Sequence, residues 1–216
     1  MNDIVKEWYE NPTNIDQMPS LGRLKLWEEE VVKHFPLNAR VLDVGCGMGR
    51  EAFALNDMGY YVVGIDTSQA IIDRVTQLAH DNSYDIPFVH YDGYNLPFDY
   101  AQFDVVIFWS QTFGLLYGEQ KKYDYLNQCR KVTVRNGLLS FSTHDHAYVS
   151  KNYGRYEIGN RFYPYANTEL YWETFLPEQL MQYATATGYS ILYCGSGEVY
   201  RPEDGTILHC LCRNDR

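Results

Sequence analysis

The stretch VLDVGCGMGRE, residues 41–51, decides how the rest of the chain is interpreted. An apolar run contains one acid, Asp43. Glycines then occupy every second position, at Gly45, Gly47 and Gly49. Glycine tolerates a positive φ and lets another group lie directly against the backbone. Where such a turn joins a strand to a helix, backbone N–H groups point at a bound ligand. We therefore predict a ligand-binding turn here.

Short apolar runs alternate with helical patterns along the chain. The runs that predict strands are 41–44, 61–66, 87–92, 103–109, 137–144, 189–194 and 206–212. Helices are predicted at 50–58, after Ser68, at 121–134 and at 177–188. This alternation predicts an α/β fold: a Rossmann-like, seven-stranded sheet, mostly parallel, with helices on both faces. Only a loop, 195–206, separates the last two strands, so we expect the last strand to be antiparallel.

One segment, residues 147–175, does not fit the alternation. It is rich in aromatic side chains: Tyr148, Tyr153, Tyr156, Phe162, Tyr163, Tyr165, Tyr171, Trp172 and Phe175. Loops of this length in compact domains are usually functional or structured on their own. The segment starts at the carboxyl edge of the predicted sheet, where open α/β sheets bind ligands. We interpret it as an inserted hairpin or lid; a plain aromatic cluster or a dimer contact is the alternative.

Composition excludes some classes of function. The chain has 18 basic and 28 acidic residues, and no basic run is longer than Lys121-Lys122, which disfavours nucleic-acid binding. No apolar stretch is long enough to span a membrane, and the first residues do not resemble a signal peptide. An odd number of cysteines, five, is typical of reduced thiols. We therefore expect a soluble cytoplasmic protein without a membrane partner, either a monomer or a homodimer.

Two further acids follow predicted strands. Asp66 comes 17 residues after Gly49, and a carboxylate there offers two acceptor oxygens to neighbouring ribose hydroxyls. Asp92 ends the third strand and can accept a hydrogen bond from an exocyclic amine such as that of adenine. Arg50 occupies the position where the dinucleotide fingerprint requires its third glycine, which argues against a dehydrogenase. The pattern therefore favours a nucleoside ligand other than NAD.

Four motifs in succession resemble a known family. VLDVGCGMGREA, VVGIDTS, VHYDGYNLPFDYAQFDVVIFW and RKVTVRNGLLSFS look like the motifs of the class I S-adenosylmethionine (SAM)-dependent methyltransferases, from about residue 38 to 145. The resemblance implies SAM as cofactor. It favours a small-molecule acceptor, because the Asn-Pro-Pro-aromatic signature and the Pro-Cys pair of nucleic-acid enzymes are absent. It also implies a layout: 1–36 a helical segment over the cofactor, 37–146 the cofactor-binding core, 147–175 a substrate lid, and 176–216 the rest of the core.

The resemblance also implies roles for individual residues. Those that would surround the methionine part and the ribose are Asp43, Gly45, Cys46, Gly47, Gly49, Asp66 and Thr67, with Asp43 holding the amino group. Those that would read the adenine are Asp92 and the amide of Gly93. Trp109, next to Phe108 and Ser110, would lie near the methionine end, Arg23 would meet the cofactor carboxylate, and Tyr9 would cover the cofactor.

In such an enzyme the acceptor atom must be aligned with the sulfur–methyl bond, and water must be excluded. We predict N- or O-methylation, with His144 or His146 in STHDH as general base where the acceptor arrives protonated. A metal site at these histidines is an alternative. A SAM-binding protein without turnover and an RNA or protein methyltransferase remain alternative functions.

Overall fold

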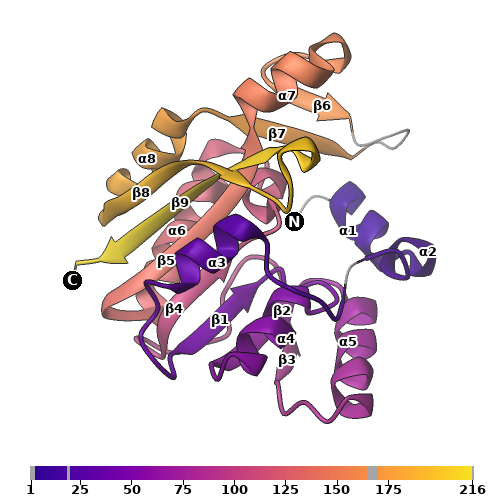
Figure 1. The fold of residues 1–216 in the computed structure, drawn as a ribbon, viewed down its shortest axis with the longest axis vertical. Coiled ribbons are helices and arrows are strands. Elements are labelled where there is room, and N and C mark those ends of the chain that lie inside the picture. Colours follow the sequence, from indigo (N-terminus) through magenta and orange to yellow (C-terminus); the bar gives the residue numbers. More distant parts are fainter. Residues whose placement is uncertain (1–2, 19, 165–169, 216) are drawn as a thin grey trace.

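The computed structural model describes residues 3–18, 20–164 and 170–215, and the predicted α/β fold is confirmed (Figure 1). Its strands are β1 Arg40–Val44, β2 Tyr61–Asp66, β3 Phe88–His90, β4 Phe103–Phe108, β5 Thr133–Asp145, β6 Phe162–Pro164, β7 Tyr171–Phe175, β8 Tyr189–Glu198 and β9 Thr206–Asn214. Its α-helices are α1 Asp3–Glu10, α2 Pro12–Ile15, α3 Leu26–Val32, α4 Arg50–Asp57, α5 Gln69–Asp81, α6 Glu119–Val132, α7 His146–Tyr153 and α8 Pro177–Ala186. Short 3-10 helices are η1 Thr112–Leu115, η2 Gly154–Tyr156 and η3 Pro202–Asp204.

Seven strands form the main sheet in the order β3-β2-β1-β4-β5-β9-β8. The first five are parallel, and β9 runs antiparallel to both β5 and β8. The expected antiparallel last strand is therefore confirmed, and it lies inside the sheet rather than at its edge. All parallel strands end at one edge, so the turn after β1 and the residues after β2 and β4 come together there.

Both faces of the sheet are covered by helices, because the buried strands are apolar on both sides. Alternate residues of β1 divide between two cores, with Leu42 in one and Val41 in the other. The first core includes Leu126 of α6 and Leu180 of α8. The second includes side chains from α3, α4 and α5, among them Trp27. The sheet therefore forms the middle layer of three.

The segment 147–175 contains α7, η2 and a hairpin. Strands β6 and β7 pair antiparallel, and β7 continues the sheet for two residue pairs beside the end of β5. The hairpin and α7 project at one end of the molecule, at the top of Figure 1. The expected hairpin is thus present, and its action as a lid stays a prediction. Tyr165 lies outside the described residues.

The loop expected at 195–206 is shorter in the structure. Strand β8 continues to Glu198, and only residues 199–205 join it to β9. Gly195 and Gly197 suggest a loop in the sequence, but in β8 they permit close packing. A Cβ on Gly197 would lie 2.5 Å from Cβ of Trp27, and one on Gly195 would lie 2.7 Å from the Tyr193 hydroxyl. These glycines therefore admit neighbouring side chains to the strand surface.

The N-terminal helices pack near the carboxyl edge of the sheet. The Ser68 hydroxyl, which also caps α5, donates a hydrogen bond to the carbonyl of Tyr9 at the end of α1. Ile15 of α2 is buried in a small cluster with Met48 and Ile71. Among the residues that the structure describes, no helix combines the length and apolar character needed to cross a membrane.

Candidate active site

A pocket of about 840 Å³, open to solvent, lies at the carboxyl ends of β1, β2 and β4. It is lined by the glycine turn, by Asp66 and Thr67 after β2, and by Ser110 and Thr112 after β4. Tyr9 and Met18 from the N-terminal segment form another wall. The turn predicted from residues 41–51 therefore lies against a cavity.

Two of the three glycines keep the turn open to this pocket. Gly45 has φ of 72°, and a Cβ on it would lie 2.7 Å from Cγ2 of Thr112. Gly47 has φ of 50°, and its Cβ would lie 2.8 Å from Cε of Met18. Gly49 does not line the pocket. It precedes α4 with φ of 82°, and its Cβ would lie 2.8 Å from Cε2 of Phe53, so its role is packing.

Asp66 is held firmly in the wall of the pocket. Its Oδ2 accepts a hydrogen bond from the Gly47 amide at 3.1 Å, and its Oδ1 accepts one from the Ser68 amide at 3.0 Å. Burial raises the pKa of Asp66, while these amides oppose the rise. Each carboxylate oxygen has a second lone pair, so the side chain can still accept hydrogen bonds from a ligand.

A buried group of charges lies beside the turn. The Arg50 guanidinium donates hydrogen bonds to Glu28 at 2.7 and 2.8 Å and to Glu51 at 2.5 Å. The Ser110 hydroxyl also donates to Glu51, at 2.5 Å. Asp43 is buried nearby, and its Oδ2 has no hydrogen-bond partner among the described residues. Burial, with Glu51 close by, raises the pKa of Asp43 well above its usual range. Three carboxyl groups here face two cations, the Arg50 guanidinium and the Lys25 ammonium, which lies 3.8 Å from Glu28.

A second cavity, of about 990 Å³, adjoins the first and shares Tyr9, Met18, Ser110 and Leu115 with it. Its walls include the rings of Trp8, Tyr9 and Trp172, and the His144 ring stacks on Trp172 with 4.2 Å between centroids. The polar side chains that line it include Lys25, Asn14, Gln17 and Gln111. Two adjoining cavities therefore lie at the carboxyl edge, one lined by the glycine turn and one by a mixture of aromatic and polar side chains.

A family model described as a methyltransferase domain matches residues 41–137, which carry the glycine turn, Asp66 and β4. Over these residues, a little under half of its length, the chain carries a class I SAM-dependent methyltransferase domain. SAM is the cofactor of this family.

Individual proteins are similar to this methyltransferase over different lengths. Cypemycin N-terminal methyltransferase from a Streptomyces species is 39% identical over 93 residues, which cover 43% of this chain and only 37% of that protein. Ubiquinone biosynthesis O-methyltransferase from Coxiella burnetii is 26% identical over 202 residues, covering 88% and 80%. The structure of 1,6-didemethyltoxoflavin-N1-methyltransferase from Burkholderia thailandensis, which holds its substrate and S-adenosylhomocysteine, has the same fold, with a TM-score of 0.67 at 19% identity, covering 86% and 75%.

The residues of the first pocket fit SAM. Asp43 does not itself line the pocket; it is buried just before the turn, and its Oδ2 has no hydrogen-bond partner among the described residues. Gly45 and Gly47 both line the pocket with bare backbone, and a Cβ on either would collide with another residue of the pocket wall. Asp66 offers two acceptor oxygens that are held in place by backbone amides. It follows Gly49 by 17 residues, the separation expected for a residue that binds the ribose.

Six of the twelve residues expected to bind the cofactor line the first pocket. Those that line the first pocket are Tyr9, Gly45, Cys46, Gly47, Asp66 and Thr67. Burial raises the pKa of Cys46 well above its usual range, so it lines the pocket as a neutral thiol.

Several expected residues are placed elsewhere. Asp92 is exposed, and its Oδ1 accepts hydrogen bonds from the Tyr94 and Asn95 amides in a turn. Gly93 lines an adjoining pocket that shares Leu115 and Leu116 with the first. Trp109 is buried in the core, where its indole nitrogen donates to Ser140 at 2.8 Å. The Arg23 guanidinium lies over the Tyr200 ring.

Of the two candidate bases, only His144 lines the second cavity. His146 is directed to Thr174, with 2.9 Å between its Nδ1 and the hydroxyl oxygen. The site also contains residues that the sequence pattern did not single out, Arg50, Glu51 and Lys25. In the sequence, Arg50 attracts attention only because it replaces the third glycine of the dinucleotide fingerprint. Its position at the start of a predicted helix, next to the acid Glu51, is the signal that would have indicated the buried group of charges.

Replacing Gly45 with alanine is expected to destabilise the fold by about 2–3 kcal/mol and to weaken cofactor binding. The positive φ costs roughly 1–2 kcal/mol for a residue with a Cβ, and the new methyl group would collide with Thr112. Urea unfolding and titration with S-adenosylhomocysteine measure both effects. Gly59→Ala is the matched control, because Gly59 has φ of 90° but no described atom within 4 Å of its Cβ position. Equal losses in the two variants would contradict a role for the contact with Thr112.

The pH dependence of stability provides another prediction. Burial, and secondarily Lys25, lowers the pKa of His144 to about 3, whereas an unfolded histidine titrates near 6.5. The unfolded chain then binds more protons than the folded chain between these values, so stability falls as the pH drops below 6.5. His144→Asn is expected to lose less free energy of unfolding between pH 7 and 4 than the parent chain. Urea unfolding at each pH tests this, and parallel curves would contradict it.

Proposed function

We propose that this chain transfers the methyl group of SAM to a nitrogen or oxygen atom of a small molecule. The observation that carries the proposal is the pair of joined cavities. One is lined by the glycine turn and Asp66, and the other, which adjoins it, is lined by both aromatic and polar side chains. When bound, SAM supplies a methyl group attached to a positively charged sulfur.

The first pocket would hold the cofactor. We propose that Asp66 accepts hydrogen bonds from the two ribose hydroxyls, and that Gly45 and Gly47 allow the backbone to lie against the methionine part. Asp43 and Glu51 would face the ammonium group, whose charge favours the ionised form of the Asp43 carboxyl. Tyr9 would close the pocket from the N-terminal segment.

The second cavity would hold the acceptor. Trp172 and the His144 ring stacked on it offer flat surfaces to a planar molecule. Lys25 also lines this cavity and pairs with Glu28 at 3.8 Å, and a negative or strongly accepting group on the acceptor would give it a second partner. These contacts would align the acceptor with the methyl group and exclude water, which is most of what this reaction needs.

His144 fits an orienting role better than that of a strong base. With a pKa of about 3 it stays neutral at pH 7, so it can accept a hydrogen bond from an O–H or N–H of the acceptor. A base works best when its pKa lies near the working pH. His146, whose Nδ1 lies at hydrogen-bond distance from Thr174, is not part of this proposal.

The proposal is tested by turnover with the purified chain. SAM is incubated with a panel of phenols, anilines and nitrogen heterocycles, and release of S-adenosylhomocysteine is measured. At least one acceptor should support release, and Trp172→Ala should raise the KM for that acceptor while the affinity for S-adenosylhomocysteine stays the same. Binding of S-adenosylhomocysteine without turnover on any acceptor would favour a SAM-binding protein, and absence of binding would overturn the proposal.

A further inference from the structure

The second cavity, proposed to hold the acceptor, differs in charge from the rest of the chain. The chain carries 28 acidic and 18 basic residues, yet no described aspartate or glutamate lines this cavity. Among the described lysines and arginines only Lys25, the residue before α3, lines it. The Lys25 side chain is 13% exposed, so it is largely shielded from bulk water. A cation shielded in this way gains from a nearby negative charge, because electrostatic attraction is stronger out of water.

The nearest acid does not satisfy the Lys25 ammonium group. Oε1 of Glu28 lies 3.8 Å from Nζ of Lys25, which is beyond hydrogen-bond distance. Both Glu28 oxygens instead accept hydrogen bonds from the Arg50 guanidinium, at 2.7 and 2.8 Å, and Oε2 also accepts one from the Lys25 backbone amide at 2.7 Å. No described residue accepts a hydrogen bond from the ammonium group. Its three N–H donors are therefore available to a ligand in the cavity.

Lys25 belongs to the acceptor cavity rather than to the cofactor pocket. It does not line the first pocket, whereas Arg50 and Glu51 do. It shares the second cavity with His144 and with Trp172, whose rings are stacked on each other. A flat molecule in this cavity therefore meets an aromatic ring, a neutral imidazole and an ammonium group.

From the unsatisfied ammonium group, the lining without described acids and the Trp172 ring, we propose that the acceptor is an aromatic carboxylic acid. Its carboxylate binds Lys25, its ring lies against Trp172, and its hydroxyl or amino group lies beside His144. This inference rests on the proposed function, because it names the acceptor class of the same site.

A carboxylate fits this cavity better than a phosphate does. One ammonium group matches a single negative charge, whereas a phosphate monoester carries nearly two at pH 7. Burial lowers the pKa of Lys25, and Glu28 opposes that fall. A bound carboxylate opposes it further, so the acid and the ammonium form of Lys25 favour each other.

Binding to the chain saturated with S-adenosylhomocysteine tests the inference without requiring turnover. The probes are the ortho, meta and para isomers of hydroxybenzoate and of aminobenzoate. Each is compared with the corresponding benzamide, which has nearly the same shape without the charge. Isothermal titration calorimetry is expected to show at least one acid that binds about tenfold or more tightly than its amide. Equal affinity for every acid and its amide, or no binding of any acid, would overturn the proposal.

Lys25→Met removes the charge and nearly preserves the length of the side chain. The preferred acid should lose about tenfold or more in affinity, while its amide and S-adenosylhomocysteine bind as they do to the parent chain. A loss of affinity for S-adenosylhomocysteine as large as the loss for the acid would assign Lys25 to the cofactor carboxylate and would contradict the proposal.

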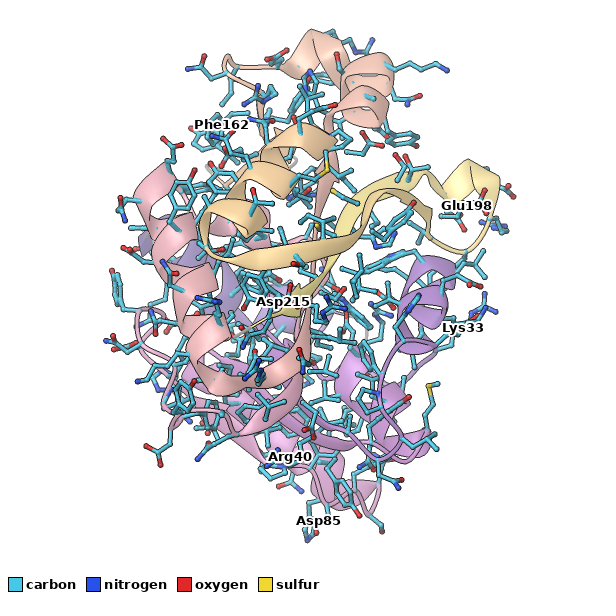
Figure 2. All side chains as sticks on the ribbon, turned by 90° about the vertical axis from the view of Figure 1, so that its left-hand side faces the viewer. Lys33, Arg40, Asp85, Phe162, Glu198 and Asp215 are labelled. Carbon is cyan, nitrogen blue, oxygen red and sulfur yellow. The ribbon has the colours of Figure 1, made fainter. Side chains whose placement is uncertain are left out.

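Lys33→Met is the matched control for Lys25→Met. Lys33 follows the other end of α3, and its side chain is 64% exposed. Figure 2 shows it on the opposite side of the molecule from Phe162, in the hairpin that includes Trp172. This variant should bind the acid as the parent chain does. An equal loss of acid affinity in the two variants would mean that overall charge, rather than contact with Lys25, attracts the acid.

The same measurements separate this inference from the proposed function. Turnover of uncharged phenols or amines, with no preference for acids over amides, would leave the proposed methyl transfer in place and overturn the aromatic acid. An acid that binds more tightly than its amide through Lys25, without turnover of any acceptor, would support recognition of the carboxylate and count against the proposed methyl transfer.

Discussion

Asp66→Ala is expected to weaken binding of S-adenosylhomocysteine by about 100-fold or more. The side chain would lose two hydrogen bonds between ribose hydroxyls and a carboxylate, each worth roughly 1.5–3 kcal/mol when one partner is charged. The Gly47 amide would also lose its acceptor, so the turn itself would be less ordered. Isothermal titration calorimetry of the two proteins measures the change in Kd directly.

Two other acids serve as comparisons for Asp66. Asp73→Ala, on the exposed face of α5, is expected to bind S-adenosylhomocysteine as the parent chain does. Asp92→Ala should lose less than about tenfold, because that exposed side chain already accepts hydrogen bonds within its own turn. A loss for Asp92→Ala as large as that for Asp66→Ala would mean that Asp92 contacts the adenine after all.

Arg50→Leu is expected to lower the free energy of unfolding by about 3–5 kcal/mol, because removing one partner leaves buried charges uncompensated. Glu28 is fully buried and Glu51 is 5% exposed, and both accept hydrogen bonds from this guanidinium. For a chain of this size the change corresponds to a fall in Tm of about 6–20 °C. Urea unfolding and thermal unfolding both measure it.

Arg74→Leu is the matched control for Arg50→Leu. Arg74 also pairs with an acid, Asp16, but both side chains are more than half exposed. Surface pairs of this kind contribute about 0–1 kcal/mol. If Arg50→Leu were no more destabilising than Arg74→Leu, the buried group around Arg50 would contribute little to the fold.

Much of the fold could be predicted from the sequence, because hydrophobic pattern and capping residues act locally. The strand at 61–66 and the helix that Ser68 caps were both expected, and Ser68 does accept a hydrogen bond from the Ile71 amide. Boundaries were less predictable where a bulge intervened. Strand β5 begins at Thr133, before the expected residue 137, since its register with β4 shifts between Phe103 and Val105.

The site was only partly predictable. Asp66 and the glycine turn follow from their position at a strand end, because chain direction in a parallel sheet determines where such residues meet. Trp109 and Asp92 were expected at the cofactor site and lie elsewhere. The direction of a side chain at the end of a strand is decided by tertiary packing, which the local sequence does not reveal. Trp109 turns into the core against Trp27. The group of Arg50 with Glu28 joins residues 22 apart in the sequence, which no local pattern reveals.

The place of β9 in the sheet has a consequence for synthesis on the ribosome. Residues 206–214 lie between β5 and β8, so two strands made earlier are joined only through a strand made later. Until residue 214 has left the exit tunnel, the antiparallel edge of β5 is unpaired and apolar. Non-local pairing of this kind is slow and leaves strand edges open to aggregation. The nascent chain is therefore expected to complete its sheet only once β9 has been made, and to depend on chaperones until then.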